Sequence, residues 1–240
     1  PVVTDRRDRC PSLARAAATA RGGASAAHPL VTLFQLRVEL TAVTADTSDD
    51  SDRTDELRAA AAAVDRGELV VYPTETVYGL GADALDAAAV ERVFDLKGRD
   101  RSNPLSLGVA SVDDALRYTR PTERAVAFAR AFLPGPVTVV VERGDRVPDA
   151  LTAGRDRVGI RVPDHDLARA LMAETGPLTA TSANVSGTGS VTRLDDLADR
   201  IREGVAAAID GGEAPGTERP VAEPDAGTAH QRVPMTGRAR

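Results

Sequence analysis

The sequence LVVYPTETVYGLGAD, residues 69–83, gives the first indication of the fold class of this chain. It opens with a short apolar run at 69–72, which predicts a buried strand. The Pro-Thr turn and the Gly-x-Gly that follow are typical of a loop whose backbone approaches a ligand closely. Upstream, Thr54 is a predicted N-cap for a helix that runs through Arg66 and ends at Gly67. A helix that leads into a buried strand and a polar loop favours an α/β fold.

The alternation of helices and strands continues along the chain. Helices are predicted at 86–97, from 111, from 121 with Pro121 in its first turn, at 164–175 and at 194–203. Strands are predicted at 105–109, 137–142, 158–162, 178–181 and 205–210. The neighbouring strands 137–142 and 158–162 favour some antiparallel pairing. We therefore expect a single α/β domain with a twisted sheet of mixed parallel and antiparallel strands and flanking helices.

The two ends of the chain differ in composition from its centre. Residues 1–53 mix Arg, Ala, Gly and Asp without a period and close on an acidic stretch, which predicts a poorly ordered extension. Residues 54–210 carry the periodic elements and form the predicted domain. Residues 211–240 are rich in Gly, Pro and charge, which predicts a disordered tail.

Composition excludes several classes of protein. The net charge of -6, from 30 basic and 36 acidic side chains, argues against a protein that binds nucleic acid through general basicity. The single cysteine, Cys10, forms no internal disulfide and has no partner for a structural zinc site. No apolar run is long enough for a membrane span. These features lead us to expect a protein of the cytoplasm.

The loop of the opening stretch offers the hydroxyls of Thr74, Thr76 and Tyr78 beside its glycines. Such hydroxyls could contact a small polar ligand. They could equally cap the turn itself, because threonines often do so. The spacing does not decide between these interpretations.

A second polar segment, KGRDRSNP at 97–104, gathers the positive charges of Lys97, Arg99 and Arg101. Arginine offers a planar fork and lysine a compact charge, so phosphate or bicarbonate would suit this loop. Lys97 alone could instead balance the dipole of the preceding helix. Arg99 and Asn103 lie in the loop proper, where that explanation does not apply.

A third segment, TATSANVSGTGS at 179–190, runs from a predicted strand into small polar residues. Ser182, Asn184, Ser186 and Ser190 could bind a nucleotide, although an ordinary Ser/Gly surface loop would look similar. The sequence contains no P-loop and only two of the three glycines of a dinucleotide fingerprint. It also lacks the HExxH and G-x-S-x-G motifs of common hydrolases.

Taken together and in order, the motifs YPTETVYGLGADA, KGR with NPL, LPGPVT, VGIRVPDH and TSANVSG resemble the YrdC-like threonylcarbamoyl-AMP synthase family. The resemblance covers about residues 59–209 and is to the short form, without an extra C-terminal domain. It implies that L-threonine, bicarbonate and ATP, with Mg²⁺ on the nucleotide, give threonylcarbamoyl-adenylate and pyrophosphate. A tRNA threonylcarbamoyltransferase complex would then modify position 37 of tRNA, with transient tRNA contact.

The resemblance also implies roles for individual residues. Lys97 and Arg99 match the family's catalytic cations, and Thr76 and Arg161 match residues that bind threonine. The matches to nucleotide-binding positions are Arg99, Asn103, Ala180, Ser182, Asn184 and Ser190. The reaction brings two anions, a carbamate and a triphosphate, close together. We therefore expect the cations to act by positioning and by electrostatic stabilisation, without a covalent intermediate.

Some positions depart from the family pattern. Gly108 stands where the family often has a histidine on the threonine side, and Arg157 stands where it often has a threonine. After residue 212, GTERPVAEPDAGTAH replaces the usual Ser-Thr-rich strand and Arg-Pro segment that close the pocket.

Two other functions remain open at this point. One is a module that binds double-stranded RNA or tRNA with weak or no synthase activity. The other is a different nucleotidyl- or carbamoyl-transferring enzyme that uses the same pocket, as in carbamoyl-phosphate-handling maturation factors that contain this type of domain. The zinc-finger and acyl-phosphatase-like parts of those proteins have no counterpart here, which disfavours it.

Overall fold

The computed structural model describes residues 47–217 and 220–225, with side chains from residue 53 onward. All of these residues belong to one compact unit of the chain. The predicted N-terminal extension lies outside the described residues as far as residue 46. Every helix in the described part falls short of the length or the apolar character that a membrane crossing requires.

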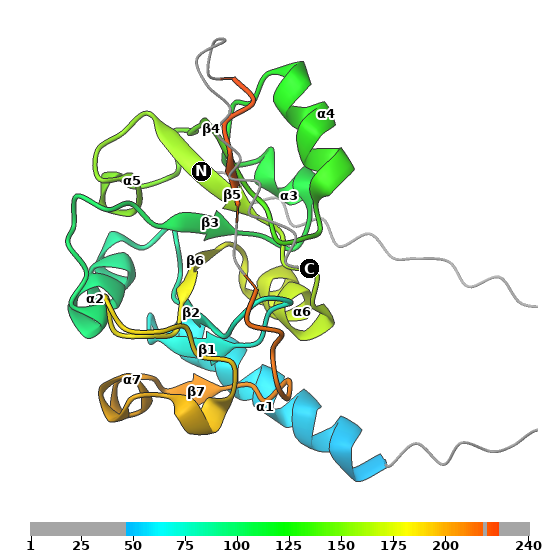
Figure 1. Cartoon of the computed structure of the whole chain (residues 1–240), viewed down its shortest axis with the longest axis vertical. Coiled ribbons are helices and arrows are strands. Elements are labelled where there is room, and N and C mark those ends of the chain that lie inside the picture. The colour runs from blue at the N-terminus through cyan, green and yellow to red at the C-terminus, as the bar shows by residue number, and fades with distance from the viewer. Residues whose placement is uncertain (1–46, 218–219, 226–240) are drawn as a thin grey trace, which may run out of the picture. The chain divides into compact units, whose positions relative to one another are not determined.

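The centre of the fold is an eight-stranded sheet with the order β7-β1-β2-β6-β3-β5-β4-β8 (Figure 1). Its strands are β1 (Val70–Tyr72), β2 (Gly79–Gly81), β3 (Ser106–Gly108), β4 (Thr138–Glu142), β5 (Arg157–Arg161), β6 (Leu178–Ser182), β7 (Ala207–Ala208) and β8 (Val221–Ala222). β1 pairs in parallel with β7, β3 with β5 and β4 with β8, whereas the other neighbours are antiparallel. The predicted mixed sheet with flanking helices is therefore confirmed.

The helices are α1 (Thr47–Asp65), α2 (Ala87–Lys97), α3 (Val112–Ala115), α4 (Glu123–Phe132), α5 (Asp149–Thr152), α6 (Asp166–Thr175) and α7 (Asp199–Gly204), with a 3₁₀ turn η1 at Leu194–Asp196. α2 follows its local signals closely. The Asp86 side chain accepts a hydrogen bond from the Ala88 N–H at 2.9 Å, and Gly98 ends the helix with a φ of 59°, where glycine carries no Cβ penalty.

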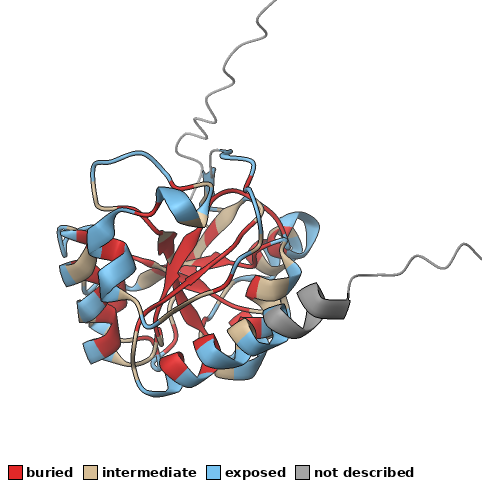
Figure 2. Ribbon diagram, turned by 90° about the horizontal axis from the view of Figure 1, so that it is seen from below, coloured by how far each residue is buried: buried red, intermediate tan, exposed pale blue. Residues whose placement is uncertain are grey.

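Helices cover the two faces of the sheet unequally. On one face, Val71, Leu80, Leu107, Val139 and Ile160 belong to the larger core, which includes apolar side chains of α2 and α5. On the other, Val70, Tyr72 and Leu178 pack with α1 and α6 in a second core. Figure 2 shows the buried strands at the centre and the exposed outer sides of the helices around them.

The predicted start of the first helix is wrong. α1 begins at Thr47, so Thr54 lies inside the helix and is not its N-cap. The acidic stretch that suggested disorder at 46–52 lies largely in the first turns of α1. Acidic residues are favourable near the positive end of a helix dipole, so the same composition supports a helix start.

Other boundaries also differ from the predictions. Pro121 precedes the N-cap Thr122 of α4. The predicted helix at 194–203 is broken, because Leu197 and Ala198 are extended, with ψ of 129° and 142°. Leu197 is buried in the larger core, which explains the break. The sequence also did not predict α5, and it treated β2 only as a glycine-containing turn.

The segment after Asp210 differs from the predicted disordered tail. The Ala214 N–H donates to the Thr192 carbonyl at 2.8 Å, and the Gly216 N–H donates to the Thr76 carbonyl at 2.7 Å. β8 then pairs with β4, with Val221 opposite Thr138. A two-residue strand at an edge depends on its partner rather than on local propensity, which is why the sequence pattern did not reveal it.

Candidate functional site

One part of the sheet presents small, partly exposed residues. Side chains alternate along strands β3 to β6, and those that face the larger core are buried. The other side carries partly exposed Ser106, Thr138, Gly159, Ala180 and Ser182. We call these five residues the open floor, because they are small and partly exposed on this face of the sheet.

Gly159 lies at a position of the open floor where a side chain would not fit. A Cβ at Gly159 would lie 2.8 Å from both the Ser106 Oγ and the Thr138 Cγ2, so no side chain fits without displacing its neighbours. Ser106 and Ala180 are directly opposite each other in the β3–β6 pairing. The small side chains of four adjacent strands, β6, β3, β5 and β4, therefore share one surface.

The neighbouring part of the same face is closed by helix α6. A Cβ at Gly108 would lie 2.8 Å from the Met172 Cε and 3.3 Å from the Ala180 Cβ. Gly108 is thus buried under Met172, which belongs to the second core. The histidine that the resemblance expects at this position would require Met172 to move.

The first polar group beside the open floor joins the loop after β1 to the end of β5. The Arg161 Nη2 donates to the Glu75 Oε1 at 2.5 Å and to the Thr76 Oγ1 at 3.3 Å. The hydroxyls of Thr74 and Thr76 lie 3.0 Å apart, and the Val77 N–H donates to the Thr74 Oγ1 at 3.2 Å. The two residues predicted to bind threonine, Thr76 and Arg161, are therefore in contact.

Glu75 is the residue of this group that the sequence did not single out. Its second oxygen, Oε2, accepts the Asp164 N–H at 3.1 Å. Its partner Arg161 is 86 positions away. An acidic residue between two threonines, in a segment already marked by its hydroxyls and glycines, was the available signal.

The second polar group forms where α2 meets the end of β6. The buried Lys97 Nζ donates to the Ser182 carbonyl, to the Asn184 carbonyl at 2.6 Å and to the Asn184 Oδ1 at 3.4 Å. The Ser182 hydroxyl also donates to the Asn184 Oδ1. Three predicted residues thus meet, and the ammonium holds the turn after β6 in place.

The Asn184 side chain shapes the rest of that turn. Its Nδ2 donates to the Val185 carbonyl at 2.9 Å and to the Thr188 carbonyl at 2.8 Å. Ala180 lies on the open floor, whereas Ser190 is exposed in the loop that the turn begins.

The third polar group is the KGRDRSNP loop. Arg99 donates from Nε to the Asn103 carbonyl at 3.0 Å and from Nη2 to the Pro104 carbonyl at 3.1 Å. Arg155 donates to the Ser102 carbonyl at 3.0 Å, which fixes the loop from the β5 side. Arg99 and Asn103 are thus brought together, and the loop that carries them runs from the end of α2 to the start of β3.

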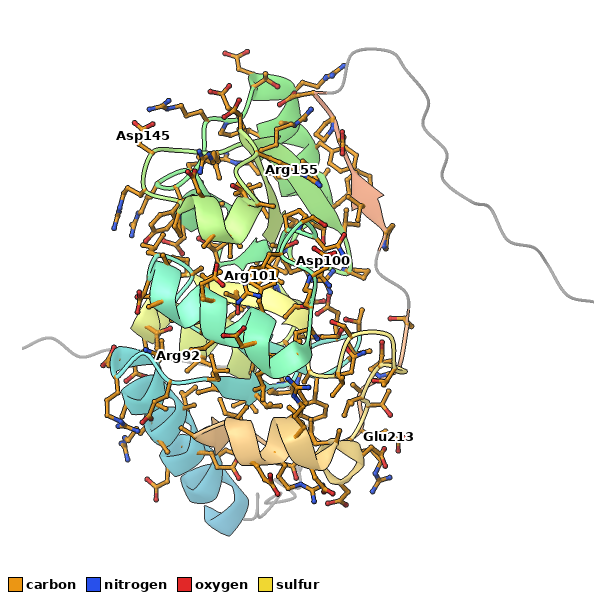
Figure 3. All side chains as sticks on the ribbon, turned by 90° about the vertical axis from the view of Figure 1, so that its left-hand side faces the viewer. Arg92, Asp100, Arg101, Asp145, Arg155 and Glu213 are labelled. Atoms are coloured by element: carbon orange, nitrogen blue, oxygen red, sulfur yellow. The ribbon has the colours of Figure 1, made fainter. Side chains whose placement is uncertain are left out.

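Arg101 lies in the same loop, but its side chain makes different contacts from that of Arg99. Its guanidinium pairs with Glu91 and Asp95 of α2, each at 2.6 Å and on the exposed side of the helix. Figure 3 shows Arg101 over α2, with Asp100 and Arg155 near the same loop. Unlike Lys97 and Arg99, Arg101 therefore attaches the loop to the exposed side of α2.

The segment after β7 (Ala207–Ala208) borders the loop that carries Thr76. The Tyr78 hydroxyl donates to the Gly212 carbonyl at 2.7 Å, lies 3.1 Å from the Asp210 Oδ1 and accepts the Gly211 N–H at 3.1 Å. Burial, above all, raises the pKa of Tyr78 to about 12. The neutral phenol therefore connects the site loop to the segment that leads to β8.

The site offers cations and hydroxyls more than metal ligands. Within residues 47–217 and 220–225, no group of three or more His, Cys, Asp or Glu side chains is arranged to hold a metal ion. The Glu75 carboxylate is paired with Arg161, and the Asp100 carboxylate accepts the Ser102 N–H at 2.8 Å. A divalent cation here would need most of its oxygens from a substrate.

Comparison with known proteins gives a consistent family. The family model of Sua5, YciO and YrdC domains, described as telomere recombination, matches residues 62–228. The threonylcarbamoyl-AMP synthase of Pyrococcus abyssi (strain GE5 / Orsay) is 42% identical over 161 residues, which are 66% of this chain and 47% of that protein. The enzyme of the same name from Bacillus subtilis (strain 168) is 39% identical over 160 residues, or 65% of this chain and 46% of that protein. The chain thus spans about half the length of these curated relatives.

Solved structures agree with this family. P. abyssi Sua5 complexed with L-threonine superimposes with a TM-score of 0.67 at 40% identity, covering 70% of this chain and 50% of that chain. E. coli YciO gives a TM-score of 0.65 at 25% identity, covering 71% of this chain and 84% of that chain.

Proposed function

The chain belongs to the family of Sua5, YciO and YrdC domains, and we propose that it forms threonylcarbamoyl-AMP and pyrophosphate from L-threonine, bicarbonate and ATP. The observation that carries this proposal is the open floor together with its polar neighbours. Arg161 and Thr76 meet at the end of β5, and Ser182, itself part of the floor, meets Asn184 and Lys97. Relatives at 42% and 39% identity that bear the synthase name support the same activity.

The threonine end of the proposed site lies at Arg161. A guanidinium binds a carboxylate with two parallel hydrogen bonds, and the Thr76 hydroxyl beside it can bind a second polar group of the same small molecule. The superimposable P. abyssi Sua5 was solved in complex with L-threonine, which supports this assignment. The buried position of both residues favours a small ligand with fixed orientation.

The nucleotide end lies over the open floor, between the turn after β6 and the KGRDRSNP loop. Carbamoylated threonine attacks the α-phosphorus of ATP, and pyrophosphate leaves. Arg99 in its loop supplies positive charge for the phosphates, with Asn103 beside it. Ser182, Asn184, Ser190 and the backbone of Ala180 would contact the nucleotide. The contacts of Lys97 suit a residue that fixes the turn and adds positive charge beneath it.

Mg²⁺ belongs to this proposal as a companion of ATP. The chain provides no cluster of acidic ligands within its described residues, so triphosphate oxygens and water would supply the coordination. Transfer of the product to position 37 of tRNA by a separate transferase complex, with transient tRNA contact in the cytoplasm, completes the proposed role.

Pyrophosphate release from ATP tests the proposed function. We expect release to require both L-threonine and bicarbonate, and mass spectrometry should identify threonylcarbamoyl-AMP. Equal release without threonine would contradict the proposal. RNA binding that weakens with salt, without any consumption of ATP, would favour the RNA-binding alternative instead.

A further inference from the structure

The ion pair between Glu75 and Arg161 lies almost entirely out of solvent. The Glu75 side chain is 17% exposed and that of Arg161 only 5%, with 2.5 Å between Oε1 and Nη2. A pair this shielded has a large desolvation cost, and it is weak evidence for a purely stabilising role. Its place beside Thr76 suggests that it serves the ligand.

Both charges are held in fixed positions by different parts of the fold. Arg161 is the last residue of β5, opposite Gly108 of β3. Glu75 lies in the loop after β1, and the Asp164 N–H holds its Oε2 at 3.1 Å. The two groups therefore form a rigid pair of opposite charges rather than a flexible surface contact.

We propose that this pair recognises the zwitterion of an amino acid, with Glu75 binding the ammonium group and Arg161 the carboxylate. The inference rests on the proposed function and adds a residue to its substrate site. A free amino acid carries two opposite charges on neighbouring carbons, so it needs opposite charges at a similar separation. A carboxylate offers about four lone-pair positions and Glu75 uses one on each oxygen for Arg161 and Asp164, which leaves acceptors for N–H donors.

A simpler role for Glu75 would be to orient Arg161 alone. The two roles differ in what happens to a ligand that lacks the amine. If Glu75 binds the ammonium, its charge strengthens the binding only of ligands that have one. If it merely orients Arg161, its loss weakens every carboxylate that Arg161 binds.

Calorimetric titration of the purified chain without ATP separates these roles. The ligands are L-threonine and 3-hydroxybutanoate, which keeps the carboxylate and the hydroxyl but has no amine. We expect Glu75→Gln to weaken L-threonine binding at least tenfold while 3-hydroxybutanoate binding changes less than twofold or becomes tighter. Equal weakening of both ligands, or no change for threonine, would overturn the proposal.

Two further variants control for the loss of a carboxylate elsewhere and for poor folding of Glu75→Gln. Asp166→Asn removes an exposed carboxylate from the first turn of α6, where it pairs with Arg169, and should leave both affinities unchanged. Glu75→Asp keeps the charge but withdraws it by one methylene, so it should lose threonine affinity selectively even where Glu75→Gln folds poorly. An equal loss of both ligands with Glu75→Asp would again count against the proposal.

The proposed function and this inference can fail separately. If the wild-type chain binds L-serine but not L-threonine, the substrate assignment fails. The comparison of serine with 3-hydroxypropanoate then still decides the role of Glu75. If wild type binds L-threonine and the Glu75 variants do not discriminate, the inference fails and the proposed function stands.

Discussion

At the scale of single residues, Arg99 and Arg101 make a natural comparison. Both lie in the KGRDRSNP loop, but Arg99 contacts the loop carbonyls whereas Arg101 pairs with α2 on its exposed side. We expect Arg99→Ala to reduce pyrophosphate release about 100-fold, because the variant lacks the positive charge that stabilises the negative charge developing on the phosphates in the transition state. Arg101→Ala should change the rate less than threefold. Similar losses in both variants, at unchanged melting temperature, would mean that Arg99 has no special role.

Lys97 belongs to the same scale but should behave differently. Its buried ammonium bonds to oxygens of Ser182 and Asn184, so Lys97→Met keeps the volume and leaves these acceptors without their donor. Each unsatisfied buried polar group costs about 1–3 kcal/mol. We expect urea unfolding to show a loss of about 3 kcal/mol, together with a loss of activity. A fully stable but inactive Lys97→Met would instead assign Lys97 to the reaction alone.

The raised pKa of Tyr78 predicts how folding stability changes at alkaline pH. Its pKa in the folded protein, about 12, lies above the ordinary value of 10.0. The unfolded state therefore loses its proton first, so the stabilisation is complete below pH 10 and is lost as the pH rises through 12. Folding stability of the wild type should fall by an amount on the order of 2 kcal/mol relative to Tyr78→Phe over this window. Parallel stability curves for the two proteins in alkaline urea titrations would contradict the assignment.

At the scale of elements, local signals predicted much of the fold. α2 was predicted with both ends because Asp86 and Gly98 act within one turn of the helix. β8 was missed because its two residues depend on β4. The same distinction applies to the site. Thr76 and Arg161 were found through their motifs, whereas the ion pair between Glu75 and Arg161 depends on how the loop after β1 meets the end of β5.

The open floor gives a prediction about strand β5. Gly159→Val would place methyl groups against Ser106 and Thr138, which already lie 2.8 Å from a Cβ position. Overpacking of this kind costs about 1–3 kcal/mol. We expect the folded variant to bind a non-hydrolysable ATP analogue at least tenfold more weakly while L-threonine binding changes little. Normal affinity for the analogue in calorimetry would place the nucleotide away from β5.

At the scale of the whole described unit, one segment joins the two edges of the sheet. β7 and β8 lie at opposite ends of the strand order, and the described residues between them in sequence are 209–217 and Pro220 (Figure 1). Along the way the segment bonds to Tyr78, Thr192 and Thr76, and the Pro220 carbonyl accepts the Thr138 N–H at 3.0 Å. The backbones of Thr76 and Thr138, one from each side of the site, are thus both hydrogen-bonded to this segment.

A pair of truncated chains tests this connection. A chain that ends at Asp210 loses these hydrogen bonds, each worth about 1 kcal/mol net, whereas a chain that ends at Asp225 keeps them. Because 1 kcal/mol shifts the melting temperature of a domain of this size by about 2–4 °C, the shorter chain should melt roughly 10 °C lower. It should also bind L-threonine more weakly, since the loop that carries Thr76 loses its Gly216 partner. Equal melting temperatures and equal threonine affinities would show that the segment merely lies against the sheet and does not hold the site together.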